Sequence, residues 1–142
     1  MRNVNQILGG KATKVVSVGP ETPVLDVIRL MAEHHIGSVL VTQGGRLVGI
    51  ATERDYARKV ILQGRSSSDT PVAQIMSSPV VTITPHDTVQ TCMQMMTDRK
   101  VRHLPVMEGG DVIGMVSIGD LVAAVIADQR EEIDQLQRYI AS

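Results

Sequence analysis

Two short segments of the sequence place a hydroxyl side chain three residues before an aspartate. In GIATERD the pair is Thr52 and Asp55, and in GMVSIGD it is Ser117 and Asp120. Such a pair resembles a capping box, which stabilises the first turn of a helix by about 1 kcal/mol. The short carboxylate could equally accept one hydrogen bond on each oxygen from the two vicinal hydroxyls of a ribose. Either motif by itself leaves both interpretations open.

The motif occurs twice because the chain is an internal repeat. Residues 15–61 align without a gap with residues 80–126, and Pro20, Gly44, Gly45, Gly49 and Asp55 are among those that recur identically. Upstream, VNQIL (4–8) echoes VAQIM (72–76). Two copies predict a pseudo-symmetric pair and not a solenoid. A cap tolerates several residue types at both positions, yet both copies keep a hydroxyl and an aspartate. The repeat therefore favours a ribose clamp, which is compatible with a cap.

Each copy predicts the order strand–helix–strand–strand–helix. Extended apolar pieces come first, at 14–18 and 79–83. In copy one we expect the next helix to begin at Thr22, with Pro23 in its first position. In copy two we expect it to begin at Asp87. Apolar residues then follow at helical spacing: Val24, Val27, Ile28 and Met31 in one copy, and Val89, Cys92, Met93 and Met96 in the other.

Two strands and a second helix complete each copy. The strands are 38–42 and 47–52, then 104–107 and 112–117, and Gly-Gly between them indicates a tight hairpin. The second helix begins at Thr52 or Ser117, and the polar segment 62–71 is the linker. The class is α/β (α+β), one compact module with repeat 1 at 1–65, repeat 2 at 66–127 and a C-terminal helical extension at 128–142. On the last helix and the extension that continues it, Ile126, Ile133, Leu136 and Ile140 share a face that should pack on the chain or on a partner subunit.

Composition excludes several classes of function. The 142 residues carry a formal net charge of −1 without a basic cluster, and only 1% are aromatic, which argues against a nucleic-acid partner. The chain has no apolar run long enough for a membrane and no secretory signal at its start, so we expect a cytoplasmic protein. The one cysteine, Cys92, reads as a core residue. No spacing of His, Asp or Glu suggests a metal or a catalytic group, so we expect no metal and no enzyme.

The doubled unit, with GIATERD, VRHLPV and GMVSIGD as its telling segments, resembles a tandem pair of CBS (cystathionine β-synthase-type) domains, a Bateman module, over about residues 4–127. The resemblance implies a stand-alone, non-enzymatic module of the signal-transduction type. Such modules bind an adenosine-containing ligand in clefts between the two repeats and signal to a partner protein. AMP is the first expectation, with ADP, ATP, NAD(H) or S-adenosylmethionine as others. The resemblance also implies a disc-like homodimer.

The resemblance assigns roles to residues in both copies. Ribose would be bound by Thr52, Asp55, Ser117 and Asp120. Adenine would lie against Val15, Val16, Ser17, Ile36 and Ser38 in copy one, and against Pro79, Val80, Val81, Val101 and Pro105 in copy two. Phosphate would be bound by Arg54, Arg102 and His103, each of which could also be a solvated surface residue. These cations occur in one copy only, so we expect two unequal sites.

Two other functions stay open from the sequence. One is a ligand-free structural module for dimerisation or docking, in which the motifs only cap helices. The other is an enzyme such as a nucleotide hydrolase, against which the absence of a recognisable general base or metal cluster argues.

Overall fold

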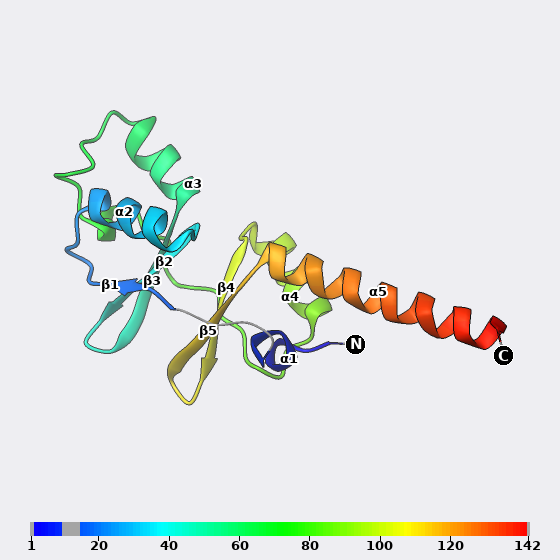
Figure 1. The fold of residues 1–142 in the computed structure, drawn as a ribbon. Helices are drawn as coiled ribbons and strands as arrows, with labels where there is room; N and C mark the ends of the chain where they lie inside the picture. The colour runs from blue at the N-terminus through cyan, green and yellow to red at the C-terminus, as the bar shows by residue number, and fades with distance from the viewer. Residues whose placement is uncertain (1, 10–14, 142) are drawn as a thin grey trace. The chain divides into compact units, whose positions relative to one another are not determined.

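The protein is described by a computed structural model over residues 2–9 and 15–141 (Figure 1). Lys14 of the first predicted extended segment and Ser142 of the predicted C-terminal extension lie outside these residues. The chain divides into two compact units. The first unit is residues 15–80, and the second unit combines the described part of 1–14 with that of 81–142.

The first unit is a three-stranded sheet with helices. Strand β1 (Ser17–Val18) pairs in parallel with β2 (Ser38–Gln43), which pairs antiparallel with β3 (Arg46–Thr52). Helix α2 (Val24–His34) packs on β2. Helix α3 (Glu53–Tyr56) follows β3 and continues as the π-helical turn η1 (Ala57–Ile61), and the 3-10 turn η2 (Val72–Gln74) comes later. The predicted Gly-Gly hairpin is confirmed, because Gly44 and Gly45 have φ values of 58° and 78° that suit glycine.

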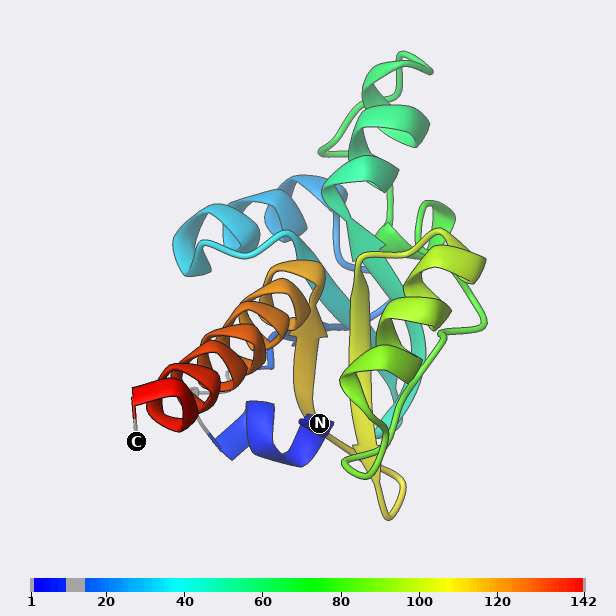
Figure 2. The same ribbon diagram turned by 90° about the vertical axis from the view of Figure 1, so that its right-hand side faces the viewer.

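The second unit has the same hairpin, and its last helix is longer than that of the first unit. It contains α1 (Val4–Gly9), α4 (Val89–Arg99), β4 (His103–Glu108), β5 (Asp111–Ser117) and α5 (Ile118–Ala141). Strands β4 and β5 pair antiparallel in the register of β2 and β3. Figure 2 shows α1, α4 and α5 on one side of the β4–β5 hairpin. The mixed α/β class and the doubled unit are therefore confirmed.

Each unit has its own apolar core, and the predicted helical stripes supply both. Val24, Val27 and Met31 of α2 are buried with Val39, Val41 and Ala51 of the sheet. Val89, Cys92 and Met96 of α4 are buried with Leu104, Val106 and Val116. Ile28 and Met93 are partly buried against these cores, so the sequence periodicity identified the inward faces correctly.

The segments upstream of the repeats pack differently from the predicted ranges 1–65 and 66–127. Val4 of α1 is fully buried in the core of the second unit, and its N–H donates to the Asp87 carbonyl (2.9 Å). Val72 is fully buried in the first unit, and its N–H donates to the Thr22 carbonyl (2.8 Å). Each upstream segment thus contributes a buried valine to the core of the other repeat.

Both first helices begin one residue later than predicted. The N-cap of α2 is Pro23 and not Thr22, because Pro23 has an extended ψ of 141°. The first amides of α2 are satisfied by backbone, as Val24 N–H donates to the Thr70 carbonyl (2.8 Å) and Leu25 N–H to that of Ser67 (3.0 Å). No side-chain cap is needed there.

In the second unit Thr88, and not Asp87, caps α4. The Thr88 hydroxyl accepts from the Thr91 N–H (3.1 Å). The Asp87 carboxylate is already used one turn earlier, where it accepts from the Thr84 N–H (2.8 Å). The predicted extended segment 79–83 contributes a parallel bridge from Ile83 to Val106 and no named strand among the described residues.

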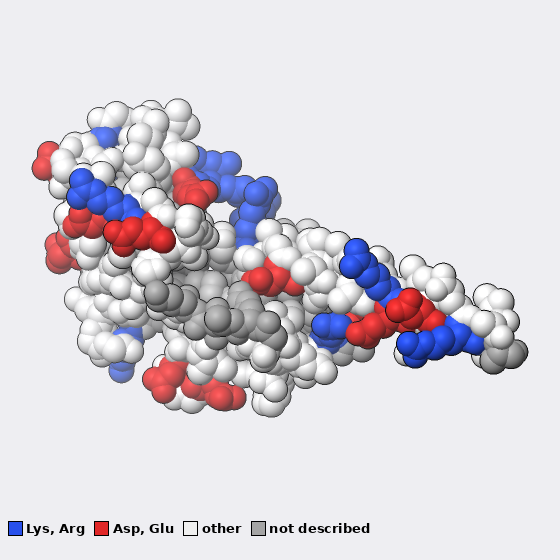
Figure 3. Space-filling model, viewed as in Figure 1, with Lys and Arg blue, Asp and Glu red and all other residues white. Residues whose placement is uncertain are grey.

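Helix α5 confirms the predicted helical extension as far as Ala141. The Arg2 guanidinium forms ion pairs with Asp128 and Glu131 of this helix, both at 2.8 Å. Basic and acidic side chains are interspersed along α5 (Figure 3). The predicted apolar face does not pack on the described part of the chain, since Ile133 is 53% and Leu136 is 61% exposed. Within the described residues, no helix combines the length and apolar character that a membrane span requires.

Candidate functional site

The two hydroxyl–carboxylate motifs have the same geometry. Thr52 N–H and the Thr52 hydroxyl donate to Asp55 Oδ2 (3.0 and 3.1 Å), and Asp55 N–H donates to Thr52 Oγ1 (3.2 Å). Ser117 and Asp120 repeat this with distances of 2.8, 3.0 and 3.2 Å. The capping interpretation of both motifs is therefore confirmed at the level of hydrogen bonds. In both motifs, one oxygen of the aspartate carboxylate accepts from the threonine or serine hydroxyl of the same motif.

The strand register places a residue of the predicted base or phosphate set opposite each motif. Ser38 pairs with Thr52 across β2 and β3, and His103 pairs with Ser117 across β4 and β5. Residues directly opposite in an antiparallel pair have Cβ atoms about 4.5–5.5 Å apart. Ser38 and His103 therefore lie beside the hydroxyl–carboxylate motif of their own unit, and the two motifs differ in this neighbour.

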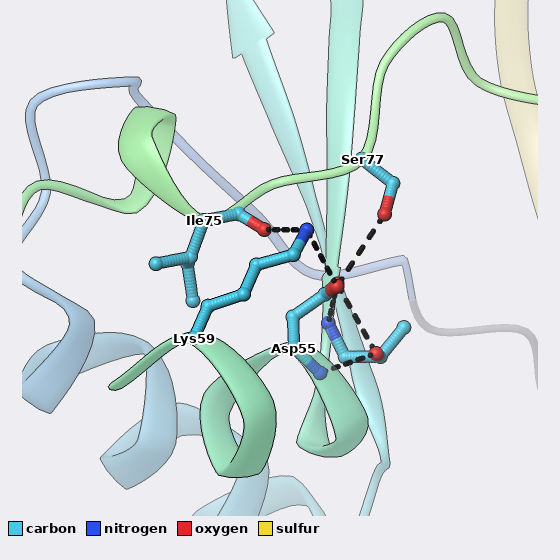
Figure 4. A network of polar contacts seen from close by, with 5 residues as sticks. Asp55, Lys59, Ile75 and Ser77 are labelled. Carbon is cyan, nitrogen blue, oxygen red and sulfur yellow. Dashed lines mark hydrogen bonds and ion pairs between the residues drawn. The ribbon is translucent and has the colours of Figure 1, made fainter. Parts of the chain in front are cut away.

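Asp55 is the centre of a denser network than its sequence motif indicates (Figure 4). Its other oxygen, Oδ1, lies 3.1 Å from Lys59 Nζ and accepts a hydrogen bond from Ser77 Oγ (3.4 Å). Lys59 also donates to the Ile75 carbonyl (2.9 Å). Asp55 is only 8% exposed. A buried carboxylate needs such partners, because an unpaired buried charge is strongly destabilising.

Sequence reasoning missed both partners on Oδ1. Lys59 could have been found, since a lysine four residues after an aspartate is a standard helical pair. Ser77 had no local signal, because it lies in the segment that leads to the second repeat. Its position is set by two backbone hydrogen bonds with Ile50 (2.8 and 3.1 Å).

The adenine candidates of copy one lie along the sheet. The Val16 carbonyl accepts from the Leu40 N–H (3.0 Å), and Ser17 follows in β1 opposite Leu40. Ser38 is buried at 6% exposure. Ile36 is partly buried against the core and lines a cavity of about 510 Å³ with residues of α2 and α3. Val15 is half-buried and precedes the sheet.

The adenine candidates of copy two divide between the units. Pro79 and Val80 belong to the first unit, and Val81, Val101 and Pro105 to the second. Val81 and Val101 are partly buried against the second core, and the buried Pro105 offers its carbonyl to the Ile83 N–H (3.0 Å). The second unit by itself therefore brings three of these five residues together.

The phosphate candidates are accessible to solvent to different extents. Arg54 on α3 and Arg102 before β4 are exposed, while His103 is half-buried. The Arg102 carbonyl accepts from the Ile118 N–H (2.9 Å), which fixes the backbone beside the Ser117 motif. On the face seen in Figure 3, basic and acidic side chains are interspersed along α5 and form no large field of one sign there.

Other chemistry in the described residues is limited. No group of three His, Cys, Asp or Glu side chains among them is arranged to hold a metal ion. The buried thiol of Cys92 has its pKa raised from 9.0 to about 11, chiefly because burial disfavours the thiolate and in addition because Asp87 is negatively charged. Cys92 is therefore a core residue, as predicted, and not an activated nucleophile.

Comparison with known protein families also finds two repeats in this chain. The CBS domain model matches residues 8–61 and 72–127. The chain is 47% identical over 122 residues to the CBS domain-containing protein CBSX3, mitochondrial, of Arabidopsis thaliana, which covers 82% of this chain and 59% of that protein. The chain thus spans less than two thirds of the length of that relative.

Two solved structures extend the comparison to the fold. A protein with CBS domains from Burkholderia ambifaria is 49% identical, with a TM-score of 0.87 over 90% of this chain and 96% of that one. A CBS domain protein from Pyrobaculum aerophilum, solved in complex with AMP, is 26% identical, with a TM-score of 0.74 over 84% of this chain and 89% of that one. Because the family model matches both repeats and the fold agrees, this chain belongs to the CBS-domain family.

Proposed function

We propose that the chain is a regulatory module that binds an adenosine nucleotide, AMP in the first instance, and signals its presence to a partner protein. The Thr52–Asp55 and Ser117–Asp120 motifs would bind ribose, in agreement with the residues that the sequence predicts. ADP, ATP, NAD(H) and S-adenosylmethionine are the other candidate ligands. The module needs no catalytic group for this function.

The observation that carries the proposal is the repeated geometry of the two motifs. Each holds a carboxylate at a helix start with one oxygen bound to its own hydroxyl. Each lies beside a strand residue, Ser38 or His103, that belongs to the predicted binding set. A carboxylate fixed in this way can grip vicinal hydroxyls without losing further side-chain freedom. The AMP complex of the Pyrobaculum protein supports an adenine nucleotide as the ligand class.

Bound nucleotide would act by favouring one arrangement of the protein over another. A ligand shifts such an equilibrium only by its difference in affinity for the two states. The predicted base residues Val16, Ser17 and Ser38, together with the phosphate candidates Arg54, Arg102 and His103, would provide that difference. The cytoplasmic location stays a prediction, and the Arabidopsis relative is named as a mitochondrial protein.

We further propose that the module is a homodimer that pairs along α5. Exposed apolar residues recur on this helix at alternating steps of four and three, as in two-stranded coiled coils. They are Val122 (44% exposed), Ile126 (43%), Ile133 (53%), Leu136 (61%) and Ile140 (81%), with Gln129 between Ile126 and Ile133. We call this set the α5 seam. Pairing two seams would remove this apolar surface from water.

A thermal-shift screen tests the nucleotide proposal. AMP, ADP, ATP, NAD, NADH and S-adenosylmethionine would be added at millimolar concentration to the full chain. We expect AMP to raise the melting temperature, since ligand at about 100 times its Kd stabilises the folded state by about 2.7 kcal/mol. The double variant Asp55→Ala/Asp120→Ala should lose the shift, and Asp69→Ala/Asp111→Ala, which removes two exposed aspartates, should keep it.

A structural module without ligand is the second candidate, and the complete capping boxes favour it. In that case no adenosine compound would stabilise the protein, and Asp55→Ala/Asp120→Ala would still dimerise. The thermal-shift screen and the mass of that variant by light scattering separate the two candidates.

A further inference from the structure

We infer that the α5 seam pairs with the seam of a second copy in parallel and in register, and that Gln129 sets this arrangement by facing Gln129 of the second copy. The inference rests on the proposed homodimer and adds the direction of its two helices and the residue that decides it. The last part of α5, residues 129–141, is exposed at every residue and projects beyond α1 and α4 of its own unit (Figure 1).

The seam follows a heptad repeat over six positions of one continuous helix. Three isoleucines occupy the first position of the heptad, called a, and three residues of different types occupy the fourth, called d. The a residues are Ile126, Ile133 and Ile140, and the d residues are Val122, Gln129 and Leu136. In parallel coiled coils, isoleucine at a together with leucine at d favours two strands. The pattern therefore selects a single second copy as the occupant of the seam.

Gln129 is the polar member of these six positions, and the direction of the two helices decides what it faces. In a parallel pair each position faces the same position of the second copy, so the two Gln129 amides can donate to each other's carbonyls. In an antiparallel pair a faces d, and the register that pairs all six positions puts Gln129 against Ile133. A buried amide without a hydrogen-bond partner is destabilising. Gln129 therefore favours the parallel pair.

The charged residues beside the seam favour the same direction. Arg130 and Glu132 lie on its opposite flanks, at heptad positions e and g. In a parallel pair each flank meets the opposite flank of the second copy, so Arg130 faces the side that carries Glu132. In the antiparallel register that pairs all six positions, equal flanks meet near residue 131. Arg130 then lies near Arg130 of the second copy, and Glu132 near Glu132, and these like charges repel.

The ion pairs of Arg2 lie on a different side of the helix from the seam. Arg2 binds Asp128 and Glu131, both at 2.8 Å. These two acids occupy heptad positions c and f, which face outward in a coiled coil. A second helix can therefore lie on the seam without displacing the ion pairs that hold the N-terminal segment to α5.

Cysteine cross-linking of the full chain tests the direction of the helices. Gln129→Cys places two thiols face to face in the parallel pair, whereas the antiparallel pair offsets them by four residues, about 6 Å along the axis. Gln135→Cys is the matched control, since it makes the same exchange at an exposed c position of the same helix. With oxidised glutathione and micromolar protein, we expect Gln129→Cys to form a covalent dimer about a hundredfold faster, because facing thiols have a millimolar effective concentration. The native Cys92 is buried and does not take part.

A mixture of the Ile126→Cys and Leu136→Cys proteins gives a second readout. In the parallel pair a cysteine at 126 links only to 126 and one at 136 only to 136, whereas the antiparallel pair links 126 to 136. Trypsin cuts after Arg130, between the two positions, so mass spectrometry of the linked peptides separates these outcomes. We expect the like links alone. Adding Gln129→Leu to both proteins should make the 126–136 link appear, since the residue that requires a like partner is then gone.

The inference is overturned if Gln135→Cys links as fast as Gln129→Cys, or if the 126–136 link predominates while Gln129 is in place. Absence of that link from the Gln129→Leu mixture overturns the role of Gln129 and leaves the direction to the flanking charges. A dimer by light scattering that gives only the 126–136 link contradicts this inference and keeps the proposed α5 homodimer. A monomer under the same conditions overturns both. The thermal-shift screen measures nucleotide binding separately, so neither result decides that proposal.

Discussion

The side chain of Met76 occupies the space beside Gly49 in which any larger residue would place its Cβ atom. A Cβ built on Gly49 would lie 2.8 Å from Met76 Cγ and 3.1 Å from Met76 Cβ, and closer still to the sulfur. Gly49 is in β3, and Met76 is in the segment that packs against this strand through Ser77 and Ile50. The glycine that both repeats share is therefore needed here for close packing, and its φ is not in the left-handed region.

Gly49→Ala should lower the free energy of unfolding by about 1–3 kcal/mol, because the added methyl group forces Met76 to move within a packed core. Urea denaturation measures this loss. Gly19→Ala is the control, since nothing lies within 4 Å of a Cβ at Gly19. Met76→Ala should make the protein tolerant of Gly49→Ala, and an additive loss in the double variant would contradict the packing explanation.

Removal of either capping hydroxyl should destabilise the protein. Thr52→Ala and Ser117→Ala each remove the acceptor for the Asp55 or Asp120 N–H, which should lower the free energy of unfolding by about 1 kcal/mol. The exchanges Thr52→Ser and Ser117→Thr keep the hydroxyl and should have little effect on stability. Equal stability of the alanine and hydroxyl-bearing variants in urea would show that the caps contribute nothing.

The stability of the protein should decrease at alkaline pH in a way that depends on Cys92. The pKa of this thiol is raised to about 11 by burial and, in addition, by Asp87, against 9.0 as its ordinary value. Below pH 9 the thiol is protonated in both the folded and unfolded states, so it contributes no change there. Between pH 9 and 11 the unfolded state loses the proton first, and the free energy of unfolding falls.

Cys92→Ala should remove this part of the pH dependence. The measurement is the difference in free energy of unfolding between the two proteins at pH 8, 9.5 and 11, which should narrow as the pH rises. A constant difference over that range would contradict the buried-thiol explanation. At pH 8 the folded protein should also resist thiol-modifying reagents, because thiolate is scarce and the side chain is buried.

Disruption of the α5 seam should abolish the proposed homodimer. Leu136→Glu places a charge in the apolar interface, so light scattering should report a monomer where the unaltered chain gives a dimer. Gln137→Glu adds the same charge next to it, off the seam, and should leave the dimer intact. A dimer that survives Leu136→Glu together with Ile133→Glu would place the interface elsewhere.

The sequence by itself determined the features that depend on neighbouring residues or on the repeat. The Gly-Gly hairpins follow from glycine at two consecutive positive φ values, and the buried faces of α2 and α4 follow from helical spacing. The capping boxes at Thr52 and Ser117 were also readable, because cap and acid lie within one helical turn. The aligned copies then predicted the same unit twice, and the family model matches both.

Only the tertiary structure decided which distant segments meet. The sequence assigned the upstream segments to the repeats that follow them, yet Val4 is buried against the second repeat and Val72 against the first. Thr22 and Asp87 were predicted to cap the two first helices. In the structure, backbone carbonyls accept from the first amides of α2, and the Asp87 carboxylate accepts from the Thr84 N–H instead of capping α4. Ser77 reaches Asp55 across the segment between the repeats. Such contacts form where segments distant in the sequence bury surface against each other. Neither the spacing of residues along the sequence nor the amino-acid composition shows which segments these are.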